Sequence, residues 1–214
     1  MSTPRIAVLG SGQVAQVLAK GFQKHGYDVR MGNRDASRLA GFATQTGLKV
    51  LDLAAAAAEA DVVILALKGT AAEPVVAAIA PRLAGKVVVD AMNPIADAPP
   101  QDGVLAYFTD GNRSLMERLQ EIAPDARFVK AFNSVGSAFM VDPVFPGGRP
   151  TMFIAGNDPD AKAVVAAILE RFGWDSEDMG RAASARPIEA LCQLWCAPGF
   201  LRNQWSHAFR LLKT

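Results

Sequence analysis

Short runs of apolar residues, many of them β-branched, alternate along the chain with stretches in which apolar residues recur at helical spacing. A short continuous apolar run is typical of a strand that is buried on both faces of a parallel sheet. Helical patterns between such runs indicate repeated β–α units. The predicted strands are Ile6–Leu9, Val29–Met31, Val62–Leu67, Val87–Val89, Phe128–Phe132 and Met152–Ala155.

The helical stretches carry recognisable start and stop signals. Asp158 supplies a side-chain acceptor before the first turn of one helix and precedes a proline. Ser114 and Glu117 have the spacing of a capping box, and Gly26 and Gly173 stand where a left-handed residue commonly ends a helix. We expect helices at Val14–His25, Leu53–Ala60, Thr70–Leu83, Ser114–Ile122, Asp158–Phe172 and, before a break at Pro198-Gly199, at about Pro187–Trp195.

This alternation predicts an α/β chain of the Rossmann type, doubly wound around a mainly parallel sheet. We expect a soft boundary near residue 130. Residues 1–130 would form a nucleotide-binding Rossmann domain, and residues 131–214 a smaller C-terminal α/β extension. The tail carries Phe200, Trp205 and Phe209, which could cover a substrate ring or bury a subunit interface. Because dimers are the default oligomer, we expect a homodimer.

Composition and charge narrow the classes of partner. Of 214 residues, 22 are Lys or Arg and 21 are Asp or Glu, and this balance argues against nucleic acid or an anionic membrane as the main partner. Cys192 and Cys196 lie in one predicted helix and favour packing over a disulfide. His25 and His207 lie far apart, so no metal site is predicted. No apolar run approaches the roughly 18 residues of a membrane helix, and no signal-like stretch precedes Ile6, so we expect a cytoplasmic protein.

A glycine-rich turn follows the first predicted strand. Residues 10–15 read Gly-Ser-Gly-Gln-Val-Ala, which fits the pattern G-x-G-x-x-A. Glycines in this position allow a tight turn and a close approach of backbone N–H groups to a pyrophosphate, at the positive end of the following helix. The pattern alone is weak, but its place between a buried strand and a helix predicts a dinucleotide site.

The segment after the second predicted strand bears on which dinucleotide binds. An NAD site usually offers an acidic residue about 20 residues after the motif, for the ribose 2′-hydroxyl. Here the chain offers Asn33 and Arg34, followed by Arg38, and this set suits a 2′-phosphate. Asp35 could instead act as the NAD-type acid, and the two arginines could pair with Asp28 or Asp35 as solvated charges. We favour NADP(H).

Several short blocks of sequence outside the Rossmann motif also carry information about the family of this chain. The blocks around Lys130–Ser134 and Trp174–Arg186 are more specific than the glycine turn, which many dehydrogenases share. They lie within a series that spans most of the chain: Val8–Gly12, Gly32–Arg34, Val129–Gly136, Ala155–Asp158, Gly173–Asp175, Asp178–Gly180 and Ser184–Glu189. On these residues the chain resembles the coenzyme F-420-dependent NADP oxidoreductase family, which is the family of NADPH-dependent deazaflavin reductases.

The resemblance implies roles for particular residues. Gly10 to Gln13 would hold the pyrophosphate, the Asn33–Arg38 segment would surround the 2′-phosphate, and Ala131 would lie by the nicotinamide. Lys68 stands where a hydrophobic or aromatic residue is expected. This difference could alter the contacts to the ribose or the entry of the second substrate. The expected cofactor-binding residues are Gly10, Ser11, Gly12, Gln13, Val14, Asn33, Arg34, Arg38, Leu67, Lys68, Asn93, Ala131 and Asn133.

The expected reaction asks little acid–base chemistry of the protein. Hydride transfer needs orientation and electrostatics. A flat flavin-like acceptor needs no dedicated acid, whereas a carbonyl or imine needs a proton donor.

The candidate proton donors are Lys68, Ser134, Lys130 and His207. Of these, Lys130 is expected to face outward and His207 to be packed or solvated. Lys68 is the first to test, as an acid or as a clamp on an anionic acceptor. Asn133 is placed to recognise an amide, although it could equally satisfy local backbone groups. We assign no catalytic residue.

Three functions fit these observations. The leading interpretation is an NADP(H)-dependent oxidoreductase that passes hydride between NADPH and a flavin-like or deazaflavin acceptor. The alternatives are an NADPH-dependent reductase of a small carbonyl or imine, and a non-catalytic NADP(H)-binding redox sensor. An enzyme would consume NADPH with some acceptor, whereas a sensor would bind it without turnover.

Overall fold

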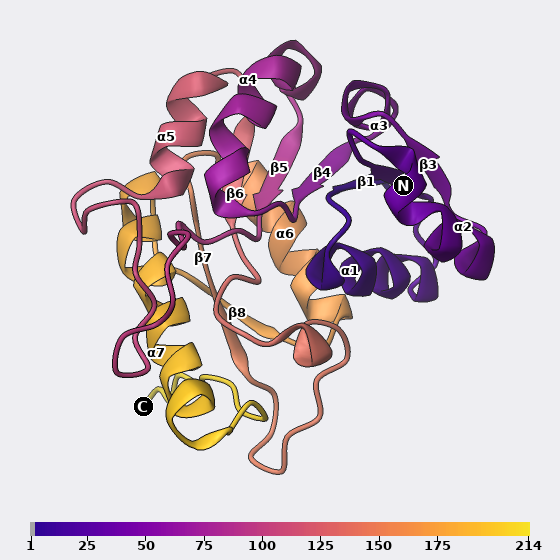
Figure 1. Ribbon diagram of the computed structural model, residues 1–214. Helices are drawn as coiled ribbons and strands as arrows, with labels where there is room; N and C mark the ends of the chain where they lie inside the picture. Colours follow the sequence, from indigo (N-terminus) through magenta and orange to yellow (C-terminus); the bar gives the residue numbers. More distant parts are fainter. Residues whose placement is uncertain (1–2) are drawn as a thin grey trace.

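One eight-stranded sheet organises the residues that the computed structural model describes, 3–214 (Figure 1). Its strands are β1 (Ile6–Leu9), β2 (Val29–Gly32), β3 (Lys49–Leu51), β4 (Val62–Leu65), β5 (Val87–Asp90), β6 (Arg127–Lys130), β7 (Thr151–Gly156) and β8 (Asp175–Asp178). The α-helices are α1 (Gln13–Lys24), α2 (Ala40–Thr46), α3 (Leu53–Glu59), α4 (Ala72–Leu83), α5 (Leu115–Ile122), α6 (Pro159–Arg171) and α7 (Ala185–Arg202). Short 3-10 helices are η1 (Ala36–Leu39), η2 (Gly69–Ala71), η3 (Ser137–Phe139) and η4 (Ala182–Ser184).

The strand order in the sheet is β3-β2-β1-β4-β5-β6-β7-β8. The first six strands of the chain pair in parallel. β7 runs antiparallel to β6, and β8 runs parallel to β7. The winding reverses at β1, which lies between β2 and β4. This is the doubly wound, mainly parallel Rossmann-type fold that the sequence predicts, although the Met152–Ala155 strand was expected to be parallel.

Both faces of the sheet are covered, which explains why its central strands are continuous apolar runs. Helices α1, α2 and α6 cover one face, with Phe22 and Leu169 fully buried there. Helices α3, α4 and α5 cover the other, with Val76 and Leu119 fully buried (Figure 1). The capping box predicted for Ser114 and the helix start predicted at Asp158 are both present.

The carboxyl ends of the four central strands are level. Leu9 pairs with Leu65, Leu65 with Asp90, and Asp90 with Lys130. The loops that leave these strands therefore meet at one edge of the sheet, beside the reversal between β1 and β4. In doubly wound sheets this edge is where ligands bind.

Two predicted strands end earlier than expected. The strand predicted to reach Phe132 ends at Lys130, because Phe132 adopts a left-handed backbone with φ of 62°, which is incompatible with an extended strand. The strand predicted to reach Leu67 ends at Leu65, where the chain turns toward η2.

The sequence pattern missed β3, β8 and α2. β8 consists of Asp-Ser-Glu-Asp and pairs only with β7 at one edge of the sheet, largely in contact with solvent. An edge strand with little apolar surface to bury shows no periodicity that could reveal it. β3, at the opposite edge, is only 3 residues long.

The last helix continues through Pro198 and Gly199, so the predicted break there is wrong. α7 runs to Arg202, and Asn203 ends it in a left-handed conformation. The tail that follows folds back on this turn. The Trp205 ring occupies the space beside Gly199, and His207 Nε2 is 2.9 Å from the Trp195 carbonyl oxygen. Tertiary packing thus holds a turn that local sequence preference disfavours.

The sheet continues across residue 130, where β6 pairs with β7. The division into residues 1–130 and 131–214 stays a prediction. Within residues 3–214, no helix combines the length and the apolar character needed to cross a membrane.

Candidate functional site

A cavity of about 940 Å³ opens at the carboxyl edge of the sheet. Its walls come from the segments that follow β2, β1, β4 and β5, in the order in which these strands lie in the sheet. We call the part lined by Asn33, Arg34, Asp35 and Arg38 the β2 end, and the part lined by Lys68, Ala91, Met92, Asn93, Ile95 and Ala96 the β5 end. The expected residues that line the cavity are Gly10, Ser11, Gly12, Gln13, Val14, Asn33, Arg34, Arg38, Leu67, Lys68 and Asn93.

The glycine turn between β1 and α1 forms the middle of one wall. Gly10 has φ of 141°, and a Cβ atom there would lie 2.2 Å from the Ala66 carbonyl oxygen. The fold itself therefore requires glycine at this position, because the turn passes directly against the chain leaving β4.

Gly12 differs from Gly10 because nothing in the fold requires it. Its φ of −74° is open to any residue, and a Cβ atom there would have no neighbour within 4 Å. Gly12 is the N-cap of α1, and no side chain within residues 3–214 caps this helix start. The wall of the cavity thus presents unpaired backbone N–H groups at the positive end of a helix, with space for an anion to approach them.

The β2 end carries two exposed arginines and one partly buried amide. Arg34 and Arg38 both line the cavity, as does Asn33, whose Oδ1 accepts the Asp35 N–H at 2.9 Å. The alternative pairing of Arg38 with Asp35 amounts to a loose contact of 4.0 Å. Asp28 pairs instead with Arg5 and Arg30.

Asp35 also lines the cavity, but its carboxylate is engaged in capping η1. Its Oδ1 accepts the Ser37 hydroxyl at 2.6 Å and the Ser37 N–H at 3.1 Å. These hydrogen bonds lower the pKa of Asp35. The carboxylate is thus turned toward its own helix start, which weakens the case for Asp35 as the acid of an NAD site.

The β5 end is shaped by a close approach between two loops. A Cβ atom on Gly69 would lie 2.1 Å from the Asn93 carbonyl oxygen, so only glycine lets η2 sit against Asn93. Lys68, directly before Gly69, forms an exposed ion pair with Asp97 at 2.5 Å. The rest of this end is lined by Ala91, Met92, Ile95 and Ala96 together with Asn93.

Two of the expected residues do not line the cavity. Ala131 is fully buried, and Asn133 is 4% exposed. Asn133 lies directly behind Asn93: its Nδ2 donates to Asn93 Oδ1 at 3.0 Å, while Asn93 Nδ2 donates to the Asn133 carbonyl at 2.8 Å. Any role of these two residues in binding stays a prediction.

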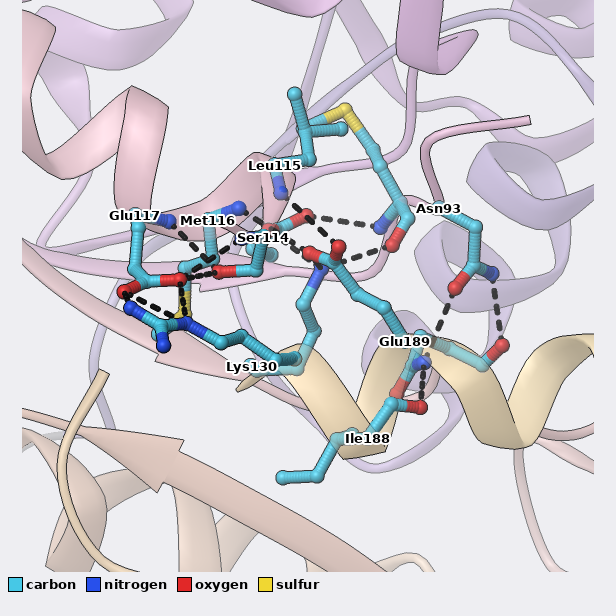
Figure 2. Close-up of polar contacts among 12 residues, drawn as sticks. Asn93, Ser114, Leu115, Met116, Glu117, Lys130, Ile188 and Glu189 are labelled. Atoms are coloured by element: carbon cyan, nitrogen blue, oxygen red, sulfur yellow. Dashed lines mark hydrogen bonds and ion pairs between the residues drawn. The ribbon is translucent and has the colours of Figure 1, made fainter. Parts of the chain in front are cut away.

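The expectation that Lys130 faces outward is wrong. Its side chain is fully buried and forms ion pairs with Asp90 at 2.7 Å and with Glu189 at 2.8 Å. Figure 2 shows the Lys130 and Glu189 side chains pointing toward one another, beside the start of α5. The alternation of apolar and polar residues in β6 suggested an exposed face, but both faces of β6 are covered.

Electrostatics hold this buried cluster together. Burial alone would disfavour a charged Lys130, but the Asp90 and Glu189 carboxylates keep its pKa above the ordinary value of a lysine. Burial raises the pKa of Asp90. Lys130 therefore carries a proton that it holds tightly, which is the opposite of what a proton donor to a substrate needs.

The other two candidate donors make their contacts away from the cavity. Ser134 is 5% exposed, and the His207 ring stacks on Trp195 with centroids 4.9 Å apart. Neither residue lines the cavity. Lys68 is the candidate that does.

The sequence pattern did not predict several residues in or behind the cavity. Ile95 and Ala96, in the loop after β5, line the cavity, and Asp90 and Glu189 form the buried cluster with Lys130. Asp90 carries one usable signal, because a carboxylate at the end of an apolar strand is costly unless it is paired. Its partner Glu189 lies too far along the chain for the sequence pattern to identify it.

Known proteins with the same features place this chain in a family. A family model described as "NADP oxidoreductase coenzyme F420-dependent" matches residues 5–94. The chain is 30% identical to a protein from Arthrobacter sp. FB24 whose crystal structure was provisionally assigned as an F420-dependent NADP-reductase, with a TM-score of 0.92. That similarity covers 98% of this chain and 100% of the other.

Two curated relatives extend the comparison. The F420-dependent NADP reductase of Methanothermobacter thermautotrophicus is 28% identical over 207 residues, covering 89% of this chain and 87% of the relative. Metalloreductase STEAP3 of Rattus norvegicus is 30% identical over 188 residues, or 88% of this chain. The chain spans only about a third of STEAP3, 36% of its length.

Three observations indicate the same family: the glycine turn, the strand ends that lie level at one edge of the sheet, and the similarity along almost the whole chain. The protein belongs to the F420-dependent NADP oxidoreductase family and is an NADP-dependent oxidoreductase.

Proposed function

We propose that the chain transfers hydride between NADPH and a flavin-like or deazaflavin acceptor at the β5 end of the cavity. One observation carries the choice of acceptor. The lining of the β5 end consists of apolar groups and the Asn93 amide, with Lys68 as its ionisable side chain. Such a surface suits two stacked flat rings, because hydride transfer between them needs alignment rather than a proton donor.

The dinucleotide would lie along the cavity from the β5 end to the β2 end. Gly12 fits a pyrophosphate, because the space beside it is open and the first turn of α1 presents uncapped N–H groups. Arg34 and Arg38 fit a 2′-phosphate at the β2 end, with Asn33 beside them. This arrangement directs the nicotinamide toward Met92 and Asn93.

Bound NADPH supplies the hydride, so the work left to the protein is binding and alignment. The uncapped start of α1 and the two arginines bind the phosphates, and the loop after β5 provides a wall for the ring. Apolar Met92 and Ile95 exclude water from that wall. We assign no acid or base to this reaction.

Replacing both Arg34 and Arg38 with alanine tests the cofactor assignment. We expect the Kd for NADPH to rise by at least about ten-fold, because hydrogen bonds to charged groups contribute about 1.5–3 kcal/mol each. The Kd for NADH should not change, and Arg113→Ala, which removes an exposed arginine outside the cavity, should affect neither. Equal losses for both dinucleotides would contradict the 2′-phosphate assignment.

The acceptor is tested by following NADPH absorbance with a deazaflavin, a riboflavin-type flavin and a cyclic imine offered in parallel. Fast oxidation of NADPH with either flat ring is the expected result. Turnover with the imine alone would favour the second candidate, a carbonyl or imine reductase in which Lys68 supplies the proton. Tight NADPH binding without turnover on any acceptor would contradict the proposal.

A homodimer remains part of the proposal. α7 and the tail leave apolar side chains exposed, with Leu194 61% and Leu201 56% accessible. Exposed apolar groups gathered on one element commonly mark a subunit contact. Light scattering of the purified chain should give twice the mass of one chain, and a monomer at micromolar concentration would contradict this.

A further inference from the structure

Three charged side chains from three distant segments meet below the β5 end of the cavity. Asp90 ends β5, Lys130 ends β6, and Glu189 lies in the first part of α7. Asp90 and Lys130 are fully buried and Glu189 is 2% exposed. Groups this costly to bury, and this far from solvent, call for a physical reason.

Every donor of Lys130 is used within the protein. Its Nζ is 2.7 Å from Asp90 Oδ2, 2.9 Å from the Met92 carbonyl oxygen and 2.8 Å from Glu189 Oε1. An ammonium has three N–H groups, so none is left for a ligand. Lys130 consequently acts on the cavity through the groups that it holds.

The group that it holds in the cavity wall is Met92. The Met92 carbonyl accepts from Lys130, and the Met92 N–H donates to Asp90 Oδ1 at 2.9 Å. Both backbone polar groups of one lining residue are thus bound to the cluster. The next residue, Asn93, is held from the other side by Asn133.

Glu189 fixes the cluster to the rest of the fold. Its carboxylate accepts the Leu115 N–H at 2.9 Å and the Met116 N–H at 3.1 Å, at the start of α5 (Figure 2). The carbonyl of the preceding residue, Ile188, accepts from Asn133 Nδ2 at 2.8 Å. The wall of the cavity, α5 and α7 are therefore joined through one set of charge-assisted hydrogen bonds.

We propose that Lys130, together with Asp90 and Glu189, is a positioning residue for hydride transfer: the cluster fixes the Met92–Asn93 wall against which the nicotinamide lies. The inference rests on the proposed function, which places the nicotinamide at the β5 end. Hydride transfer is sensitive to such a wall, because a displacement of about 1 Å of a reacting group can lower the rate by about 100-fold. The phosphates, which bind at other walls of the cavity, should not depend on it.

A test compares catalysis with binding in two variants. In Lys130→Met the wall loses the donor to Met92. In Glu189→Gln the side-chain NH2 group must face an N–H donor of α5 or the Lys130 ammonium, so the cluster is held less firmly, while the oppositely charged Lys130–Asp90 pair remains. We expect kcat to fall by about ten-fold or more in the first and by about three-fold in the second, while the Kd for NADPH changes by less than about two-fold. The fluorescence of bound NADPH should also change, because it reports the surroundings of the nicotinamide.

Lys162→Met is the matched control. Lys162 is also largely buried and pairs with Asp178 at 2.7 Å, but lies outside the cavity. This variant should keep the kcat and the NADPH fluorescence of the unmodified chain, although it loses an ion pair.

Folding is measured for each variant by thermal unfolding, because Lys130→Met leaves two buried carboxylates unpaired. If Lys130→Met does not fold, the measurements on Glu189→Gln decide whether the inference holds. Unchanged kcat and fluorescence in a folded Glu189→Gln variant would overturn the inference, as would a loss of kcat/KM that comes entirely from a higher Kd for NADPH at unchanged kcat. Failure of the unmodified chain to oxidise NADPH would instead contradict the proposed function, so the two failures are distinct.

Discussion

At the β2 end and the middle of the cavity, the wall is made by residues close together in sequence, whereas the wall at the β5 end depends on residues far apart. The glycine turn occupies residues 10–12, and the two arginines stand 4 residues apart. The Met92–Asn93 wall, by contrast, is held by Lys130, Asn133 and Glu189. In the proposed function this difference separates two tasks: short motifs bind the phosphates, and long-range contacts fix the position of the nicotinamide ring.

The largest expected effect comes from the glycine turn. Gly10→Val would place a branched side chain against the Ala66 carbonyl in a backbone conformation that only glycine adopts readily. We expect the free energy of unfolding to fall by about 3 kcal/mol or more, measured by denaturant unfolding. A variant of normal stability would show that the turn can move away from β4.

Gly12→Ala sharpens the contrast within the same turn. The fold has room for the extra methyl group, so we expect stability within about 0.5 kcal/mol of the unmodified chain. The Kd for NADPH should rise by about ten-fold, or about 1.4 kcal/mol, because the methyl group occupies the approach to the α1 N-terminus. Unchanged affinity would mean that the pyrophosphate binds elsewhere; calorimetric titration provides the measurement.

The next prediction concerns how the stability of the start of α5 depends on pH. This helix start binds Glu189, which belongs to the cluster behind the β5 end. The Arg186 guanidinium lowers the pKa of Glu117 to about 2, from 4.5. Because the folded-state pKa lies below the unfolded value, this pair stabilises the protein fully above pH 4.5, and the stabilisation is lost as the pH falls toward about 2. Arg186 is partly exposed, so screening by solvent keeps this stabilisation small.

Arg186→Ala tests the origin of this stabilisation. The variant should be less stable than the unmodified chain at neutral pH, and the difference should shrink as the pH falls below 4.5. Urea unfolding at several pH values measures it. A difference that does not depend on pH would contradict the assignment. The kcat at neutral pH should stay unchanged, because Arg186 does not touch the cavity wall.

The smallest expected effect on stability comes from Lys68→Met. The Lys68–Asp97 pair is exposed on both sides, so its removal should change the free energy of unfolding by less than about 0.5 kcal/mol. With an anionic deazaflavin the KM should rise, whereas with uncharged riboflavin it should stay the same. Equal changes for both acceptors would argue against a charge contact with the acceptor.

The sequence predicted the elements whose residues are buried on both faces. Ile6–Leu9 and Val87–Val89 could be recognised because both faces of the sheet are apolar. It failed for the edge strand at 175–178, which buries too little surface to impose a pattern. It also failed at Pro198, where contacts from the tail outweigh the preference of the local sequence.

The same distinction applies to the candidate site. Gly10, Gly12 and Arg34 could be identified as candidate binding residues from short segments. The spacing of the two glycines predicts a turn, and Arg34 lies directly after the second predicted strand. Lys130 could be named as a strand-end residue, but its burial depends on Asp90 and on Glu189 in α7. No local pattern links these three positions, so the orientation of Lys130 could not be inferred.

The buried cluster also has a consequence for how the sequence can diverge. Loss of Lys130 alone would leave two carboxylates buried without a counter-charge, and loss of either carboxylate would weaken the hold on Lys130. Single substitutions at these positions are therefore penalised for leaving a buried charge unpaired, whereas a concerted change to neutral side chains leaves no buried charge unpaired. Among descendants of this chain, positions 90, 130 and 189 should be inherited or replaced together, as one unit of evolutionary change.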